Sequence, residues 1–383
     1  MPIDPSSPPI DERLARMFEQ FAEHEFRGTS PVYTTLAFAC AEDARLARPL
    51  LAAPARQRRA LLLFAAGQYL LRTVARGHRL AEYLPVLGGD RPVDAGLVPA
   101  FADLLAQHEH EVARLCATRT TQTNEAARSA LLRPAFGRTA ELIGHRPLGL
   151  IELGTSAGLL LLPERYGYRF VDDAGVARRY GRPDAPAPLV FSCAVSGGWP
   201  EPVGVDATIG SRAGVDLNPV RSDDPDAVAW LRSCIWPEQV DRLGRLDAAL
   251  TEVAAVRPRL VAGDLVETVP SLVSSVDAAA VPVVFTCHAL TYLPGARQRQ
   301  LAAVLADLGR QRDLVVVLNE GADCGIQLFA PDAPAPPPGP TLAVLTVVSW
   351  LDGRGSVEAL GLTGPHGTSI AWQPRAYAHH PPA

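Results

Sequence analysis

The chain has 383 residues, of which 48% are hydrophobic, and carries a formal net charge of −5 with a pI near 6.0. This length suits one large or two ordinary domains with a sizeable core. The acidic balance argues against a general nucleic-acid-binding protein. Its apolar runs are too short to cross a bilayer and its first residues show no signal-peptide pattern, so we expect a cytoplasmic protein without a membrane partner.

Two residue types narrow the chemistry further. All 36 basic residues are arginine. The absence of lysine excludes a pyridoxal-phosphate Schiff base, a Walker A lysine and a lysine general base. Six cysteines are scattered without a Cys-x-x-Cys pair. We therefore expect reduced core thiols and no metal site.

Residues 1–145 are predicted to form an all-helical N-terminal domain that follows a Pro-rich tail over residues 1–9. Apolar residues recur at helical spacing along most of it. The segment Gln122-Thr-Asn-Glu125 is polar where a helix is expected to start. Its side chains could cap that helix or contribute to a ligand site. In the second case, a polar substrate would be held by Gln122, Asn124, Glu125 and Arg128.

The stretch from Leu148 to Leu159 predicts a buried strand, a tight turn and the start of a helix. Gly154 and Gly158 would let the backbone approach a ligand closely. Two chemistries fit these residues. As Glu-x-Gly-x-x-x-Gly the stretch is a loop for a nucleotide cofactor, and as Gly-x-Ser-x-Gly it is a hydrolase elbow with Ser156 as nucleophile.

Residues 146–383 alternate predicted strands and helices, which indicates an α/β domain with a Rossmann-like, mainly parallel sheet and helices on both faces. An irregular β insertion is predicted at about 165–212, with a hairpin over 166–180. Two closing strands, at 341–351 and 356–372, are expected to add an antiparallel edge.

Successive predicted strands end in polar residues, as a ligand cleft at the carboxyl edge of a parallel sheet requires. These residues are Glu152, Asp216, Asp264 and the run 286–288. A carboxylate after the second strand can accept both ribose hydroxyls, roughly 20 residues beyond the glycine loop. We assign this role to Asp216 because it ends a buried strand. Asp172 has the better spacing but belongs to the predicted hairpin.

The hydrolase alternative remains open at this point. Ser156 could be completed by Asp264 or Asp313 and by His366, in the chain order of the α/β-hydrolases. However, such an elbow normally follows earlier strands, and here 145 helical residues precede it. The cofactor interpretation is therefore favoured.

The same residues resemble the motifs of class I, Rossmann-like S-adenosylmethionine-dependent methyltransferases. Their acid-x-Gly-x-Gly-x-Gly motif matches residues 152–158 except at Ser156, and their ribose, adenine-side and fourth motifs resemble residues 215–219, 263–265 and 285–293. The resemblance implies S-adenosylmethionine as the cofactor. The residues it implies for cofactor binding are Glu152, Gly154, Ser156, Gly158, Asp216, Leu217, Asp264 and Leu265.

A closer resemblance covers nearly the whole chain. Six blocks recur in order in an actinobacterial family catalogued as domain of unknown function 2332, which is regarded as methyltransferase-like. They are Gln122-Thr-Asn-Glu with Arg128-Ser-Ala, residues 152–158, Arg165-Tyr-x-Tyr, residues 215–219, Tyr292-Leu-Pro and Pro365-His-Gly. The chain departs from that pattern at Leu160, where Asn is expected, and at Ala127, where Gly is expected.

These observations predict a methyltransferase, or a methyltransferase-like enzyme, that acts on a small polar molecule. His288 is the first candidate for a general base and Glu320 the second. Arg128 and Tyr292 would suit a substrate that carries a carboxylate. Alternatives are a protein of this fold without methyl transfer or with other sulfonium chemistry, and the serine hydrolase. We expect no nucleic-acid partner and allow for a homodimer.

Overall fold

The computed structural model describes residues 12–336 and 343–379, so the predicted tail over residues 1–9 lies outside the described residues. The chain divides into two compact units. One is a helical unit of residues up to 123 together with 224–244. The other is an α/β unit of residues 124–223 and 245 onward. This division differs from the predicted boundary after residue 145.

The helical unit is built from amphipathic helices around an aromatic core. Its helices are α1 (Glu12–Gln20), α2 (Pro31–Glu42), α3 (Ala44–Ala47), α4 (Ala60–Arg72), α5 (Leu97–Gln107), α6 (Glu109–Thr118) and α8 (Pro225–Ser233). The rings of Phe26, Tyr33 and Phe64 contact one another in its core in tilted and edge-on arrangements. The indole of Trp230 donates a 2.8 Å hydrogen bond to the carbonyl of Thr120. This contact explains why α8, far along the chain, belongs to this unit.

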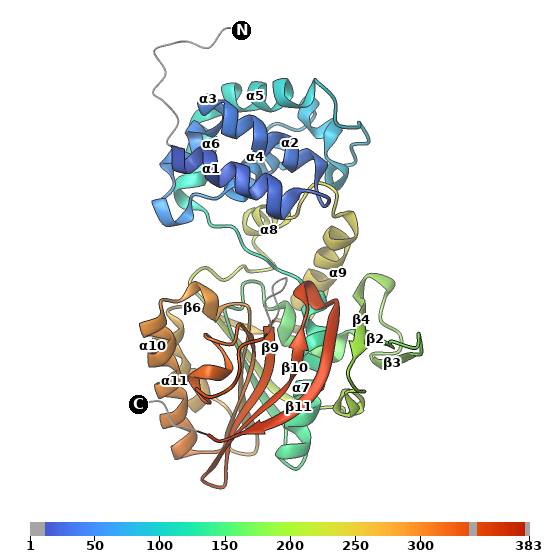
Figure 1. Cartoon of the computed structure of the whole chain (residues 1–383), viewed down its shortest axis with the longest axis vertical. Coiled ribbons are helices and arrows are strands. Elements are labelled where there is room, and N and C mark those ends of the chain that lie inside the picture. Colours follow the sequence, from blue (N-terminus) through green and yellow to red (C-terminus); the bar gives the residue numbers. More distant parts are fainter. Residues whose placement is uncertain (1–11, 337–342, 380–383) are drawn as a thin grey trace. The chain divides into compact units, whose positions relative to one another are not determined.

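The α/β unit contains a single eleven-stranded sheet among the described residues, in the order β3-β2-β4-β11-β10-β9-β8-β7-β1-β5-β6. Part of this order, from β9 through β10 to β11, can be followed in Figure 1. Its strands are β1 (Leu148–Leu153), β2 (Gly167–Asp172), β3 (Ala177–Gly181), β4 (Val190–Ser196), β5 (Ile209–Asp216), β6 (Arg259–Ala262), β7 (Val281–Cys287), β8 (Leu314–Glu320), β9 (Ala343–Leu351), β10 (Arg354–Thr363) and β11 (Ser369–Tyr377). Parallel pairs outnumber antiparallel ones, so the prediction of a mainly parallel sheet is confirmed.

The five strands β6, β5, β1, β7 and β8 are all parallel. Their helices are α7 (Ser129–Leu142), α9 (Val240–Val256), α10 (Leu265–Ser274) and α11 (Gly295–Gln311). Val284 packs in the core with α10 and α11, whereas the ring of the next residue, Phe285, meets that of Phe136 of α7 edge to face. Because alternate residues of a strand face opposite sides, α7 covers one face of the sheet and α10 and α11 the other.

The antiparallel part begins at β9, which pairs with β8, and continues through β10 and β11. The predicted closing strand over 356–372 is two strands, separated by the short turn η13 (Pro365–Gly367). The segment predicted to be an irregular insertion is more regular than expected. Its strands β2, β3 and β4 extend the sheet beyond β11, to which β4 pairs in parallel.

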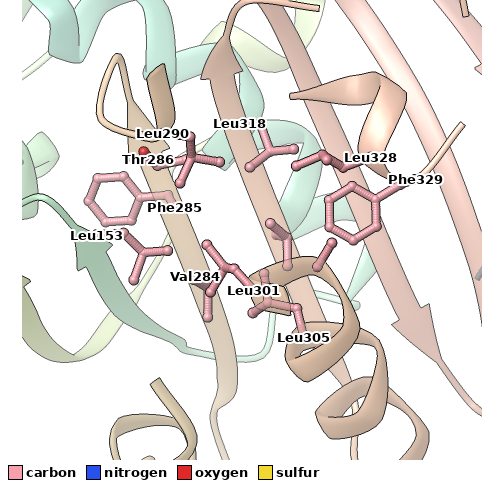
Figure 2. A pocket seen from close by; sticks show the side chains of 12 residues that line it. Leu153, Val284, Phe285, Thr286, Leu290, Leu301, Leu305, Leu318, Leu328 and Phe329 are labelled. Carbon is pink, nitrogen blue, oxygen red and sulfur yellow. The ribbon is translucent and has the colours of Figure 1, made fainter. Parts of the chain in front are cut away.

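Figure 2 shows a small void between β7, β8 and α11. Every side chain labelled around it is apolar except Thr286, whose hydroxyl is already bonded to Glu320. The void is a packing gap in the core and offers no groups that would orient a polar ligand. Within the described ranges, no helix is both long and apolar enough to cross a membrane.

Candidate functional site

The loop that follows β1 turns sharply at the carboxyl edge of the sheet. Gly154, Ser156 and Gly158 all have left-handed backbones, with φ of 72°, 47° and 74°. A Cβ atom on Gly154 would lie 2.6 Å from the Cβ of Ala289, which follows β7, so only glycine fits this close approach. The loop is therefore pressed between the ends of β1 and β7.

The helix expected after this loop is absent. In its place are two short 3₁₀ turns, η7 (Leu159–Leu161) and η8 (Pro163–Arg165). Pro163 has no N–H to donate and its ring prevents a continuous α-helix through this position. The prediction that a helix starts here is therefore wrong.

Glu152 is the buried acid of this loop, with 4% of its surface exposed. Its Oε2 accepts a 2.7 Å hydrogen bond from the Thr155 hydroxyl. Burial raises the pKa of Glu152 to about 8, the Thr155 bond opposes that rise, and the nearby Asp216 carboxylate adds to it. The side chain is therefore largely protonated at neutral pH.

Asp216 lies at the end of β5 and joins two loops. One carboxylate oxygen accepts the Ser156 N–H and the other accepts the Asn218 N–H, each at 2.9 Å. A carboxylate has about four acceptor positions, so two remain for a ligand. Asp172, the alternative by spacing, ends β2 and binds the N–H groups of Ala174 and Val176 in its own turn. The acid that contacts the glycine loop is Asp216.

The side chains that follow these acids differ in exposure. Leu217, next to Asp216, is 69% exposed, whereas Leu265, next to Asp264, is buried in the core. Asp264 is the N-cap of α10 and accepts the N–H groups of Val266 and Glu267. It is also paired with Arg297. Leu265 is therefore a core residue and not the cofactor contact that the sequence predicted.

His288 follows β7 directly in a left-handed conformation, with φ of 57°. Its backbone N–H donates to the carbonyl of Asn319, the residue before the last of β8. Burial, together with the charges of Arg128 and His366, lowers the pKa of His288 to about 4. The imidazole is neutral at pH 7, and its Nε2 is buried without a hydrogen-bond partner.

Glu320 is the last residue of β8 and is fully buried. Its Oε1 accepts the Thr286 hydroxyl at 2.7 Å and the Ala289 N–H at 2.8 Å, while Oε2 is buried without a partner. Burial raises the pKa of Glu320 to about 7, against the hydrogen bonds and the charge of Arg128. A carboxyl group with a pKa near the working pH can both accept and release a proton.

Arg128 ends the short turn η6 (Ala126–Arg128), which packs against η13. Gly367 in η13 has φ of 86°, and a Cβ atom there would lie 2.1 Å from the carbonyl oxygen of Ala127. This close approach brings two distant segments together, and the charges of both Arg128 and His366 reach His288. His366 is thus a turn residue that lies beside the predicted base.

The remaining predicted substrate residues have different contacts and belong to different parts of the fold. Asn124 belongs to the α/β unit and donates from its amide to the Ser156 hydroxyl at 2.6 Å. Glu125 is buried, caps η6 and pairs with Arg245 at 3.2 Å, which indicates a structural role. Gln122 belongs to the helical unit. Tyr292, in η11 (Leu290–Tyr292), is 68% exposed.

The structure limits the hydrolase alternative. Asp313 immediately precedes β8, whereas Ser156 lies beyond the carboxyl end of β1, so these residues are at opposite edges of the parallel strands. Asp313 instead pairs with Arg146 at 2.6 Å. The other candidate acid, Asp264, is engaged as the cap of α10. A triad of Ser156 with Asp313 is excluded.

Sequence reasoning missed the buried polar layer beneath this site. Asn319 is fully buried, donates to the sulfur of Cys287 and accepts the Thr363 hydroxyl at 2.7 Å. The available signal was the pair Asn319-Glu320 at the end of an otherwise apolar strand. Among the described His, Cys, Asp and Glu side chains, no group of three could hold a metal ion.

One comparison with known proteins gives a match. The model of a bacterial family described as "Uncharacterized protein conserved in bacteria (DUF2332)" matches residues 15–372. The chain matches no protein with a curated description.

Proposed function

The chain belongs to the DUF2332 family, and from the carboxyl edge of its sheet we propose that it is an S-adenosylmethionine-dependent methyltransferase acting on a small polar molecule. The observation that carries this proposal is the order of the parallel strands, β6-β5-β1-β7-β8. It corresponds to the order 3-2-1-4-5 of the doubly wound nucleotide-binding folds. Ligands of such sheets bind where the strand order reverses, which here lies between β1 and β7.

The residues at that position fit the proposed cofactor. The close approach of Gly154 to Ala289 leaves loop backbone at the reversal point, and Asp216 has acceptor positions left for two ribose hydroxyls. Ser156 stands where a pyrophosphate-binding loop requires glycine, which favours a cofactor without phosphates. The exposed side chain of Leu217 would cover an adenine ring, and burying it would add to the affinity.

The residues that would bind the methyl acceptor also support the proposal. S-adenosylmethionine supplies an electrophilic methyl group, so the protein must position the acceptor and remove its proton. Of the two predicted bases, Glu320 is the better suited. Its pKa is raised to about 7, whereas that of His288 is lowered to about 4. A base works best when its pKa lies near the working pH.

The proposal is tested by calorimetry with S-adenosylhomocysteine on a matched pair of variants. Asp216→Asn removes the charge that would bind the ribose, and a charge-assisted hydrogen bond of this kind is worth about tenfold or more in affinity. Asp172→Asn makes the same change in the β2–β3 turn and should leave the affinity unchanged. Equal affinities for the two variants, or a loss only in Asp172→Asn, would overturn the assignment of Asp216.

Two other functions share these residues. A protein that binds the cofactor without transferring a methyl group would pass the calorimetric test but consume no methyl donor when offered a metabolite extract. The hydrolase is favoured by one observation, the left-handed backbone of Ser156, because a nucleophile elbow needs such a strained turn. Covalent labelling of Ser156 by a fluorophosphonate would support that function.

A further inference from the structure

Three buried polar atoms near the ends of β7 and β8 have no hydrogen-bond partner. They are Nε of Arg128, Nε2 of His288 and Oε2 of Glu320, and we call them the unpaired trio. Buried polar atoms are nearly always paired, because an unmade hydrogen bond is costly in a dry environment. Three such atoms of different chemistry in one place call for a common explanation.

The members of the trio influence one another but are not bonded. Arg128 is close enough to lower the pKa of His288, and it also opposes the rise that burial causes in the pKa of Glu320. Yet no ion pair joins the guanidinium of Arg128 to the carboxylate of Glu320 in the part of the chain that the structure describes. The charged groups of Arg128 and Glu320 therefore influence each other without being directly paired.

Each member is held in place by a contact that does not involve the trio. Glu320 is fixed through its other oxygen by Thr286 and Ala289. The backbone at Arg128 is anchored by the contact of its turn with Gly367, and the backbone of His288 by its hydrogen bond to β8. The backbones of Arg128 and His288 and one oxygen of Glu320 are therefore anchored independently of the three unpaired atoms.

We propose that the trio binds the methyl acceptor and that this acceptor carries a carboxylate close to a nucleophilic N–H or O–H group. Arg128 binds the carboxylate, for which a guanidinium is the best-matched partner. Oε2 of Glu320 accepts the hydrogen of the nucleophile. The neutral imidazole of His288 completes the site from a third side. This inference rests on the proposed function and specifies its substrate class.

The transfer step balances with these groups. A lone pair of the acceptor nitrogen or oxygen forms a bond to the methyl carbon. The bond between that carbon and the sulfonium sulfur breaks, and its electron pair stays on the sulfur as a thioether. The proton of the acceptor passes to Oε2 of Glu320, which is the only atom of the trio that is purely an acceptor when ionised.

The test uses the full chain saturated with S-adenosylhomocysteine and follows its thermal unfolding. The probes are L-alanine, L-lactate, anthranilate and salicylate, each compared with the amide of the same skeleton. At least one carboxylate is expected to raise the melting temperature, and its amide is not. Arg128→Gln should weaken the binding of that carboxylate at least tenfold. Arg138→Gln removes a charge from the nearby helix α7, where Arg138 pairs with Glu358, and should not weaken it.

A second variant distinguishes the loss of a binding group from a failure to fold. Arg128→Lys keeps the charge but loses the planar fork of the guanidinium, so it should fold and still lose most of the carboxylate effect. A protein that responds to S-adenosylhomocysteine but to none of the four carboxylates would overturn this inference and leave the proposed function standing. An undiminished response in both Arg128 variants would overturn it as well. Failure to respond to S-adenosylhomocysteine would instead count against the proposed function.

Discussion

At the scale of single residues, the two buried glutamates at this sheet edge are the most informative. Glu152 and Glu320 lie at the ends of β1 and β8, and burial raises the pKa of each. Each accepts a threonine hydroxyl, from Thr155 and Thr286 respectively. They differ in the hydrogen bonding of the second carboxyl oxygen, because of the two only Glu320 has a buried oxygen without a partner. Glu152 therefore shapes the loop, and Glu320 is the residue for which we propose a chemical role.

The raised pKa of Glu152 makes stability depend on pH. An unfolded glutamate has a pKa near 4.3, so the folded state binds an extra proton between there and about 8. This contribution to stability is complete below the unfolded pKa and is lost as the pH rises through the folded one. Glu152→Gln should therefore flatten the fall in unfolding free energy between pH 5 and pH 8, measured by urea denaturation.

The control for this experiment is Glu201→Gln, which makes the same change at an exposed position. Its unfolding free energy should follow the wild-type pH dependence. If Glu152→Gln also followed the wild-type curve, the carboxyl group of Glu152 would not be protonated in the folded protein.

At the level of elements, the site depends on short turns held together by glycines. The turn η13 approaches η6 so closely that Gly367 leaves no space for a side chain. The two turns are far apart in the sequence, and neither has a hydrophobic period that would predict their contact. The contact nevertheless positions Arg128 and brings His366 close to His288.

Gly367→Ala tests this contact. A left-handed backbone costs an L-residue about 1–2 kcal/mol, and here the new methyl group would also meet the Ala127 carbonyl. Gly353→Ala is the matched control, since Gly353 has φ of 73° but open space around it. We expect Gly353→Ala to lower the unfolding free energy by about 1 kcal/mol and Gly367→Ala by clearly more. Equal losses in urea denaturation would show that the η6–η13 contact is loose.

At the scale of the whole molecule, local patterns predicted the parallel strands better than the grouping of distant segments. The apolar runs of β1, β7 and β8 identify buried strands because both of their faces are covered. Local patterns could not predict that β4 pairs with β11, because the residue pattern of a strand does not specify which distant strand it pairs with. The same holds for α8, which joins the helical unit through Trp230.

For the candidate site, the sequence likewise predicted the local features and missed those that depend on packing. The loop acids Glu152 and Asp216 follow from strand ends and glycines, and the structure brings both to one edge. The buried roles of Leu265 and Glu125 were missed because burial depends on what packs against a residue, which spacing alone does not reveal. The partnerless oxygen of Glu320 is likewise visible only in three dimensions.

The central claim is that the carboxyl edge of β1, β5 and β7 binds S-adenosylmethionine. A crystal structure of the full chain with S-adenosylhomocysteine tests it most directly. We predict that the ribose hydroxyls bind Asp216, that the loop from Gly154 to Gly158 faces the methionine part, and that the sulfur points toward His288 and Glu320. A ligand bound away from this edge, or crystals that take up none at saturating concentration, would contradict the account.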